Sequence, residues 1–146
     1  MERILIIDED EEMGSLLRDF LREEGYQIEV TRNLAAARDI LSRKLFNLVI
    51  TGLRLAGSPG MNIFPVIKRL QPGVSILVIT ALGSEEMQRR SMEMGASAYL
   101  EKPVHFPEIR AMVHDLLSQH GQKKYGVMAG SLPNGRKARG GGAESW

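Results

Sequence analysis

The sequence contains no cysteine, and this absence excludes disulfides, thiolate metal sites and a cysteine nucleophile. Long hydrophobic runs are also missing. The apolar part of the N-terminal MERILIID is too short for the core of a signal peptide or for a membrane span. With 43% hydrophobic and 25% charged residues, the composition is that of a globular protein. We therefore expect a cytoplasmic protein without a membrane partner.

A large net charge is missing as well, since the formal charge is +1. The charge is uneven: residues 121–146 carry a net +4, and the first 120 residues carry −3. The segment 121–146 is basic, rich in glycine and without an apolar period, so we expect it to be disordered. A basic tail could contact nucleic acid or an acidic partner, but a solvated chain end is the simpler interpretation.

Residues 1–120 alternate between strand-like and helix-like segments. Runs of Ile, Leu and Val over 3–7, 47–51 and 75–80 predict parallel strands that are covered on both faces. Residues 27–31 alternate in polarity, which favours a strand nearer the edge, and residues 97–101 form a short fifth candidate.

Between these strands, apolar residues recur at helical spacing. The expected helices carry Met13 to Leu21 in the first, and then cover about 33–44, 60–70, 84–94 and 106–120. Five βα units in one domain predict a doubly wound parallel sheet with right-handed crossovers. In such sheets, function lies at the carboxyl ends of the strands.

Acidic residues follow the first strand in the stretch IDEDEE. Asp10, Glu11 and Glu12 are explained by the positive end of a helix dipole. Asp8 and Glu9 come directly off a buried strand, and two adjacent carboxylates there repel each other unless a cation or a lysine lies between them. We therefore favour a cation-facing pair over simple helix capping.

The other strand ends carry fewer chemical groups. The third strand ends at Gly52, the fourth ends at Thr80, and the fifth is followed by Lys102 and Pro103. A single threonine or lysine at such a position is weak evidence, because a threonine after a strand is more often a turn or capping residue. The ordered combination with the acidic pair is much more specific.

The chain resembles the receiver domain of two-component response regulators. ILIIDEDEEM, FNLVITGLRLAG, ILVITALGS and GASAYLEKP each align with a family motif, and the resemblance covers residues 1–120. It implies a flavodoxin-like fold with five helices and a five-stranded parallel sheet in the order 2-1-3-4-5. In that family, an aspartate at the end of the third strand accepts a phosphoryl group from a histidine kinase.

The resemblance also implies a metal site. Asp8 and Glu9 correspond to the acids that hold Mg²⁺ in the family, and the backbone carbonyl of Arg54 corresponds to a further ligand. The phosphoacceptor aspartate is normally a ligand too, but its position is occupied by Gly52. We therefore expect Mg²⁺ binding to be weakened, although not excluded.

Three switch residues follow from the same resemblance. Thr80 corresponds to the threonine that contacts the phosphoryl group, and Tyr99 to the aromatic residue whose rotamer follows the switch. Lys102 corresponds to the lysine that pairs with the phosphoryl group, and the bond from Lys102 to Pro103 is commonly cis in the family. Without a phosphoryl group, we expect Lys102 to form a salt bridge with Asp8 or Glu9.

Gly52 is the main departure from the family. The loop that typically reads DLRMPGMDG is GLRLAGSPG here, so the acceptor, the proline and the second aspartate are all missing, and Asn47 stands where the family often has aspartate. Glycine provides no carboxylate to accept a phosphoryl group. It also permits a positive φ or a close approach to a neighbouring chain segment. Several changes in one segment indicate a domain released from phosphotransfer.

The sequence therefore predicts an atypical receiver domain, a pseudo-receiver in two-component signalling, that is not an enzyme and acts through protein contacts. The partner is a histidine kinase, an output protein or a second copy, bound by the fourth helix, fifth strand and fifth helix. Methionines in the polar fourth helix suit an adaptable surface, but core filling is equally compatible with them. Two alternatives remain: a phosphorylatable receiver with a non-standard acceptor and Mg²⁺, and a regulator that contacts nucleic acid through its basic tail.

Overall fold

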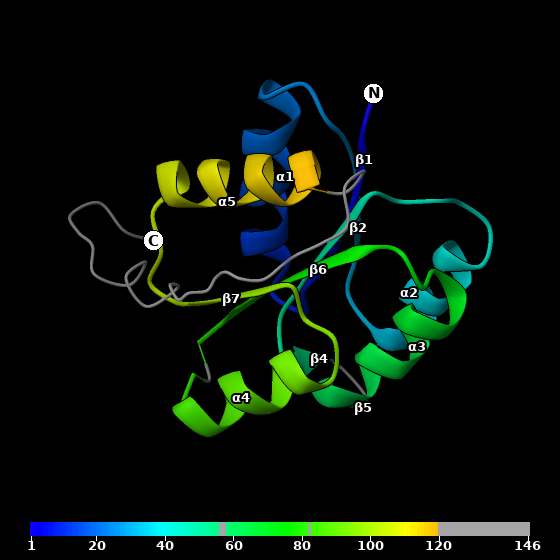
Figure 1. Cartoon of the computed structure of the whole chain (residues 1–146). Coiled ribbons are helices and arrows are strands. Elements are labelled where there is room, and N and C mark those ends of the chain that lie inside the picture. Colours follow the sequence, from blue (N-terminus) through cyan, green and yellow to red (C-terminus); the bar gives the residue numbers. More distant parts are fainter. Residues whose placement is uncertain (56–57, 82, 120–146) are drawn as a thin grey trace.

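Figure 1 presents the computed structural model, which describes residues 1–55, 58–81 and 83–119. Its main sheet has five parallel strands in the order β2-β1-β3-β6-β7. The strands are β1 (Arg3–Ile7), β2 (Gln27–Thr31), β3 (Leu48–Thr51), β6 (Ser75–Thr80) and β7 (Ala98–Glu101). Counted along the chain, this is the order 2-1-3-4-5, so the predicted fold is confirmed.

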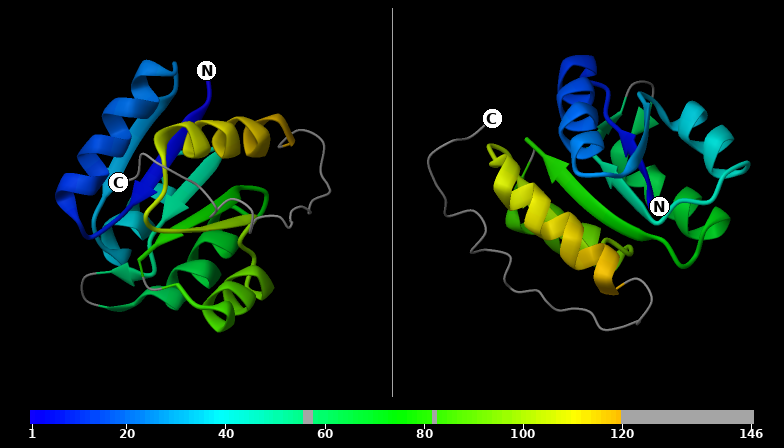
Figure 2. Two further views of the ribbon diagram at one scale, coloured as in Figure 1. Left: turned by 90° about the vertical axis from the view of Figure 1, so that its left-hand side faces the viewer. Right: turned by 90° about the horizontal axis from the view of Figure 1, so that it is seen from above.

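The helices form a layer on each face of the sheet. They are α1 (Glu11–Glu23), α2 (Leu34–Leu41), α3 (Ile63–Leu70), α4 (Glu85–Glu93) and α5 (Phe106–Gln119). α1 and α5 cover one face, and α2, α3 and α4 lie on the other (Figures 1 and 2). None of the helices in the described part of the chain is long and apolar enough to cross a membrane.

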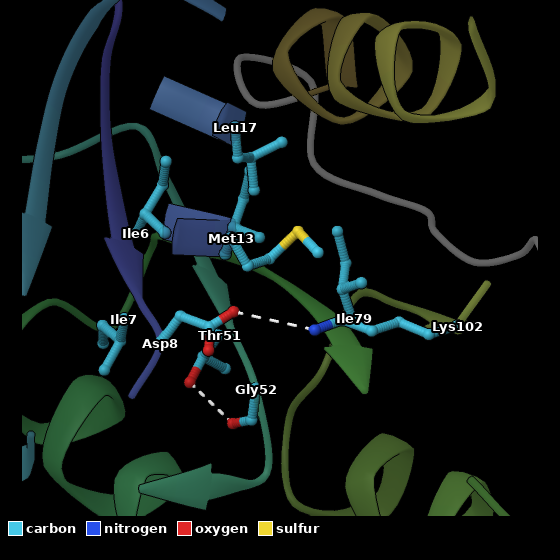
Figure 3. Close-up of a pocket in the computed structure, with 10 residues that line it drawn as sticks. Ile6, Ile7, Asp8, Met13, Leu17, Thr51, Gly52, Ile79 and Lys102 are labelled. Atoms are coloured by element: carbon cyan, nitrogen blue, oxygen red, sulfur yellow. Dashed lines mark hydrogen bonds and ion pairs between the residues drawn. The ribbon is translucent and has the colours of Figure 1, made fainter. Parts of the chain in front are cut away.

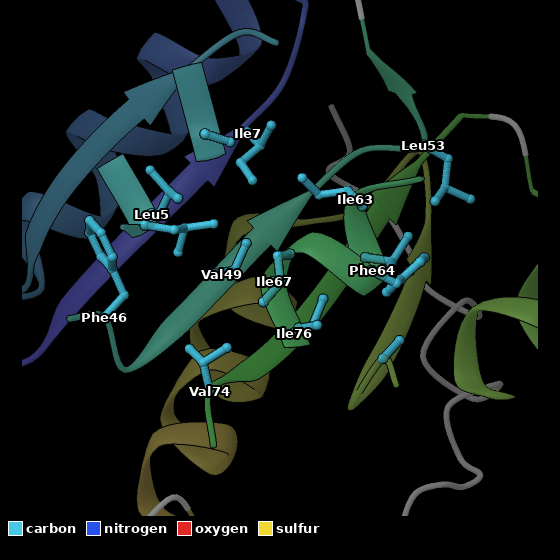
Figure 4. Close-up of a cluster of buried hydrophobic side chains, with 14 of the residues drawn as sticks. Leu5, Ile7, Phe46, Val49, Leu53, Ile63, Phe64, Ile67, Val74 and Ile76 are labelled. Carbon is cyan, nitrogen blue, oxygen red and sulfur yellow. The ribbon is translucent and has the colours of Figure 1, made fainter. Parts of the chain in front are cut away.

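Alternate residues of the central strands supply the two halves of the core. Along β1, Ile4 and Ile6 pack on the α1 and α5 side. Leu5 and Ile7 pack on the opposite side (Figure 4). All four side chains are almost completely buried. Because both faces are covered, the strand sequences are continuously apolar rather than alternating.

Local signals place the helix ends. The Asp10 side chain accepts the backbone N–H of Met13 at 3.1 Å and caps α1, as expected for an acid at a helix N-terminus. α1 and α4 are both followed by a glycine with positive φ, at Gly25 and Gly95.

Two segments differ from the expected elements. Residues 54–59 contain a short antiparallel pair, β4 (Arg54–Leu55) and β5 (Ser58–Pro59), and the 3₁₀ helix η1 (Gly60–Asn62) precedes α3, which therefore begins at 63 rather than 60. These elements are too short to produce a periodic pattern.

α2 ends at Leu41 rather than at 44, and the buried Gln71 accounts for this. Its side-chain amide donates to the carbonyls of Leu41 and Lys44, and its carbonyl oxygen accepts the N–H of Phe46. These hydrogen bonds shape the turn from α2 into β3.

Candidate functional site

The parallel ladder places Asp8 and Gly52 side by side, one residue beyond their strands. The Asp8 N–H donates to the carbonyl of Thr31 at 3.0 Å, and the Gly52 N–H donates to the carbonyl of Ile7 at 3.1 Å. Asp8 therefore follows β1 at the same edge of the sheet at which Gly52 follows β3. This is the carboxyl edge, where the fold favours a functional site.

Lys102 reaches this edge from β7. Its N–H donates to the carbonyl of Thr80 at 2.8 Å, which fixes its backbone beside the end of β6. The peptide bond between Lys102 and Pro103 is cis, so that expectation is confirmed. Thr80 itself is buried at the end of β6.

A small pocket joins the three strand ends and lies against α1 (Figure 3). Its space is at most that of a single water molecule. The lining residues are Ile6, Ile7, Asp8, Met13, Leu17, Ile50, Thr51, Gly52, Ile79 and Lys102. Most of these side chains are apolar, so Asp8 and Lys102 face each other in surroundings that screen charge poorly.

Thr51 and Met13 also line the pocket, although neither is among the site residues that the family resemblance implies. The Thr51 hydroxyl donates to the carbonyl of Gly52 at 2.9 Å. The only available signal was that a threonine ends a buried strand, and this position is common for structural threonines. Met13 belongs to the apolar stripe of α1, which gave no indication that one of its members reaches a pocket.

Asp8 is held by two different partners. Its Oδ1 accepts the N–H of Asp10 at 2.9 Å, and its Oδ2 lies 3.9 Å from Nζ of Lys102. The expected salt bridge is thus present, and it uses Asp8 rather than Glu9. Burial raises the pKa of Asp8 above its usual 3.8, and the Asp10 hydrogen bond and the charge of Lys102 oppose that increase in part.

The conformation of Gly52 does not require glycine. Its φ lies outside the left-handed region, and a Cβ placed on it would lie 3.6 Å from the carbonyl oxygen of Ile79, an ordinary van der Waals distance. Neither of the structural uses that glycine permits, a positive φ or a close approach to a neighbouring segment, applies at Gly52. A Cβ fits at this position without displacing the backbone of β6.

Glu9 and Arg54, the other expected metal-site residues, lie outside the residues that line the pocket. Glu9 is half-buried, and Arg54 belongs to β4 and is exposed. The described residues contain no group of three or more His, Cys, Asp or Glu side chains placed to hold a metal ion. Both carboxylate oxygens of Asp8 already have a partner, the N–H of Asp10 for Oδ1 and the ammonium group of Lys102 for Oδ2.

Tyr99 lies on β7 and is only 7% exposed, so its ring belongs to the core on the α2, α3 and α4 side. Burial raises the pKa of its phenol, the nearby Ser84 amide opposes this, and the charge of Glu101 adds to it. Met87 packs partly against the same core, while Met92 and Met94 are 39% and 37% exposed. The methionines of α4 thus divide between core contact and surface.

Fold and site together define the class of protein. It is a doubly wound α/β domain with an acid and a lysine at the carboxyl edge of its sheet. The chain matches the response regulator receiver domain family over residues 4–114. It is 31% identical to sporulation initiation phosphotransferase F of Bacillus subtilis, over 80% of this chain and 94% of that protein. It is equally identical to the transcriptional regulatory protein GlrR of Escherichia coli, but spans only 26% of that longer protein.

Solved structures agree with this assignment. A CheY-like receiver domain protein from Methanospirillum hungatei has a TM-score of 0.81 at 25% identity, over 85% of this chain and 99% of that one. A Burkholderia pseudomallei response regulator, solved with a phosphorylated aspartic acid and calcium, has 0.74 at 26% identity, over 82% and 70%. The beryllofluoride-activated NtrC4 receiver domain dimer has 0.78 at 26% identity, over 82% and 99%.

The chain therefore belongs to the response regulator receiver domain family of two-component signal transduction.

Replacing Gly52 with alanine tests whether glycine has a structural role there. Because the φ is compatible and the space is open, we expect Gly52→Ala to leave stability unchanged or raise it by about 0.5 kcal/mol in urea unfolding. Gly25→Ala is the matched control: its Cβ would meet nothing within 4 Å, but its φ is +103°, so we expect a loss of about 1 kcal/mol. An equal loss at both positions would show that Gly52 is a structural glycine.

The raised pKa of Asp8 predicts a pH dependence of stability. At pH values between 3.8, the usual pKa, and the raised pKa of Asp8, the folded state binds more protons than the unfolded state. The contribution of Asp8 to the free energy of unfolding therefore falls as pH rises through this range and is constant above it. Urea unfolding of wild type and Asp8→Asn across the acid range should show the wild type losing stability relative to the variant as pH rises.

An increase in the relative stability of the wild type with pH would mean that attraction to Lys102 outweighs burial. Lys102→Ala provides the matching control, because it removes an interaction that lowers the pKa of Asp8. In that variant the range of pH dependence should extend further upward.

Proposed function

We propose that this chain is a pseudo-receiver, a receiver domain that takes no phosphoryl group at the usual position and acts as a protein-interaction module rather than an enzyme. The supporting observation is that Gly52 follows β3 and lines one pocket with Asp8 and Lys102. By resemblance, this is the position of the phosphoacceptor aspartate. Nothing in the conformation of Gly52 demands glycine, so the missing side chain is a chemical change rather than a requirement of the backbone.

The remaining groups in the pocket are poor replacements for the missing acceptor. Asp8 is the one carboxylate among the lining residues, and its oxygens face the Asp10 amide and Lys102. The Thr51 hydroxyl donates its proton to the carbonyl of Gly52, and it would need a base to become a nucleophile. These contacts favour the inactive pocket over the alternative of a non-standard acceptor.

The same contacts argue for weak Mg²⁺ binding. Lys102 supplies a positive charge to Asp8, so a cation must compete with it. Asp8, Glu9 and the Arg54 carbonyl are the ligands that we propose for any metal that binds. The calcium in the Burkholderia pseudomallei structure accompanies a phosphorylated aspartate, a group for which this chain has no counterpart at Gly52.

For the partner, we propose a second copy of the chain, bound through a surface made by α4, β7 and α5. β7 is an edge strand of the sheet, and two partly exposed methionines lie at the C-terminal end of α4: Met92 in the helix and Met94 directly after it. The related NtrC4 receiver domain, whose fold is closely similar, is a dimer in its beryllofluoride-activated form. A histidine kinase or an output protein is the other class of partner for the same surface.

We assign the receiver unit to residues 1–120 and treat 121–146 as an appended basic tail. Residues 120–146 lie outside the described part of the structure. The expected disorder of the tail and its contact with nucleic acid therefore stay predictions from the sequence. We further propose that the protein acts in the cytoplasm, where two-component receivers meet their partners.

Phosphorylation with acetyl phosphate and Mg²⁺, followed by intact-mass measurement, tests the central proposal. We expect no adduct on the wild type and one phosphoryl group on Gly52→Asp, because that substitution restores a carboxylate where a Cβ fits. Gly52→Asn is the control of the same size without a nucleophilic carboxylate, and it should gain nothing.

A phosphoryl adduct on the wild type would refute the pseudo-receiver. Failure of Gly52→Asp alone would show that the altered loop, in addition to Gly52, disables the site. A parallel Mg²⁺ titration by NMR should give tighter binding in Gly52→Asp than in the wild type, because one carboxylate ligand is added.

Sedimentation velocity over a range of concentrations tests the partner proposal. We expect association of the wild type to weaken in Met92→Glu, because the substitution places a charge on an apolar contact. Leu45→Glu is the matched control, since Leu45 is 78% exposed in the segment between α2 and β3, away from α4. Equal weakening by both variants, or a monomer at all concentrations, would contradict a dimer through α4.

A further inference from the structure

Among the described helices, α4 is attached to the sheet by the fewest apolar contacts. Its one fully buried residue is Ser91, whereas each of the other four helices buries at least two apolar side chains. Met87 packs partly against the core, but most of the remaining α4 side chains are exposed. Since burial of apolar area is what attaches a helix to a sheet, α4 is weakly attached.

The buried contact that α4 does make is an unfavourable one. Ser91 is 0% exposed, and its Oγ has no hydrogen-bond partner among the described residues. α4 packs against β7, the strand that carries Tyr99. A hydroxyl buried without a partner has given up its hydrogen bonds to water, so opening the contact between α4 and β7 restores them.

Other contacts of α4 are internal to the helix or lie at its ends. Ser84 caps the N-terminus by accepting the N–H of Met87 at 3.0 Å. Arg89 pairs with Glu86 at 3.6 Å and Glu93 at 3.2 Å on the exposed face. These interactions favour helix over coil but do not hold α4 on the sheet, and a helix of this length is marginal in water by itself.

One contact anchors the turn after α4. Gly95 has φ +120°, and a Cβ placed on it would lie 2.5 Å from Cε of Lys68, so the stem of that lysine lies against the glycine. The half-buried Lys68 comes from α3, which is firmly packed. Two residues after Gly95, the chain is held to β6, because the Ser97 N–H donates to the carbonyl of Ile76 at 2.7 Å and the Ser97 hydroxyl accepts the N–H of Ile76 at 3.1 Å.

We propose that α4 detaches from β7 as a unit, well before the domain unfolds, with the turn at Gly95 as its fixed end. Detachment uncovers Tyr99 and Met87 and removes one side of the surface formed by α4, β7 and α5. The functional meaning of this opening rests on the partner proposal above, but the opening itself is a property of the isolated chain.

Hydrogen exchange of the full chain, followed by mass spectrometry under native conditions, tests this proposal. In the wild type, we expect amides of residues 85–94 to exchange at least about tenfold faster than those in the buried parts of α3 and α5. Ser91→Ala removes the unpartnered hydroxyl, and it should slow exchange in 85–94 by roughly five- to tenfold without lowering the urea midpoint.

Ser15→Ala is the matched control, because it makes the same substitution within a helix at a partly exposed site of α1. It measures the effect of helix propensity alone, which should be smaller. The proposal is overturned if α4 is as protected as α3, or if Ser91→Ala has no more effect on its helix than Ser15→Ala has on α1. Phosphorylation of the wild type, or a monomer in sedimentation, would leave the exchange result standing.

Discussion

The parallel hydrogen-bond ladder is the constraint on which the site depends. It continues past the ends of the strands, from the N–H of Asp8 to Thr31, from Gly52 to Ile7 and from Lys102 to Thr80. Because parallel strands all end at one edge, residues 44 and 50 positions apart in sequence line one small pocket. The ladder brings these positions together, and the side chains at them determine the chemistry of the pocket.

The balance of charge in the pocket follows from Gly52. One buried carboxylate, Asp8, faces one ammonium group, Lys102, and Glu9 lies outside the lining. A second carboxylate at position 52 would leave Lys102 outnumbered and would favour a bound cation. With glycine there, the pair is close to neutral by itself. The two properties that we propose, no phosphoryl acceptance and weak metal binding, would therefore have one cause, the missing side chain at position 52.

The sequence was sufficient to predict the five parallel strands and which strand ends meet at the site. Continuous runs of Ile, Leu and Val occur because helices cover both faces of the sheet. It was insufficient for β4, β5 and η1, which are too short to show a period. It left the structural role of Gly52 open, since glycine is compatible with many backbone conformations and only coordinates reveal that an ordinary one is used. The early end of α2 depended on Gln71, a residue 30 positions away from the carbonyl of Leu41.

The properties of Gly52 and α4 bear on each other. A bound group shifts a conformational equilibrium only by the difference between its affinities for the two forms. If no phosphoryl group joins the pocket, it contributes no such difference, and the position of α4 is set by the chain's own contacts. Those contacts are a partly buried Met87, a fully buried Ser91 without a hydrogen-bond partner in the described structure, and the anchored turn at Gly95. Under these conditions, whatever binds the exposed face of α4 has the largest influence on whether the helix stays on the sheet.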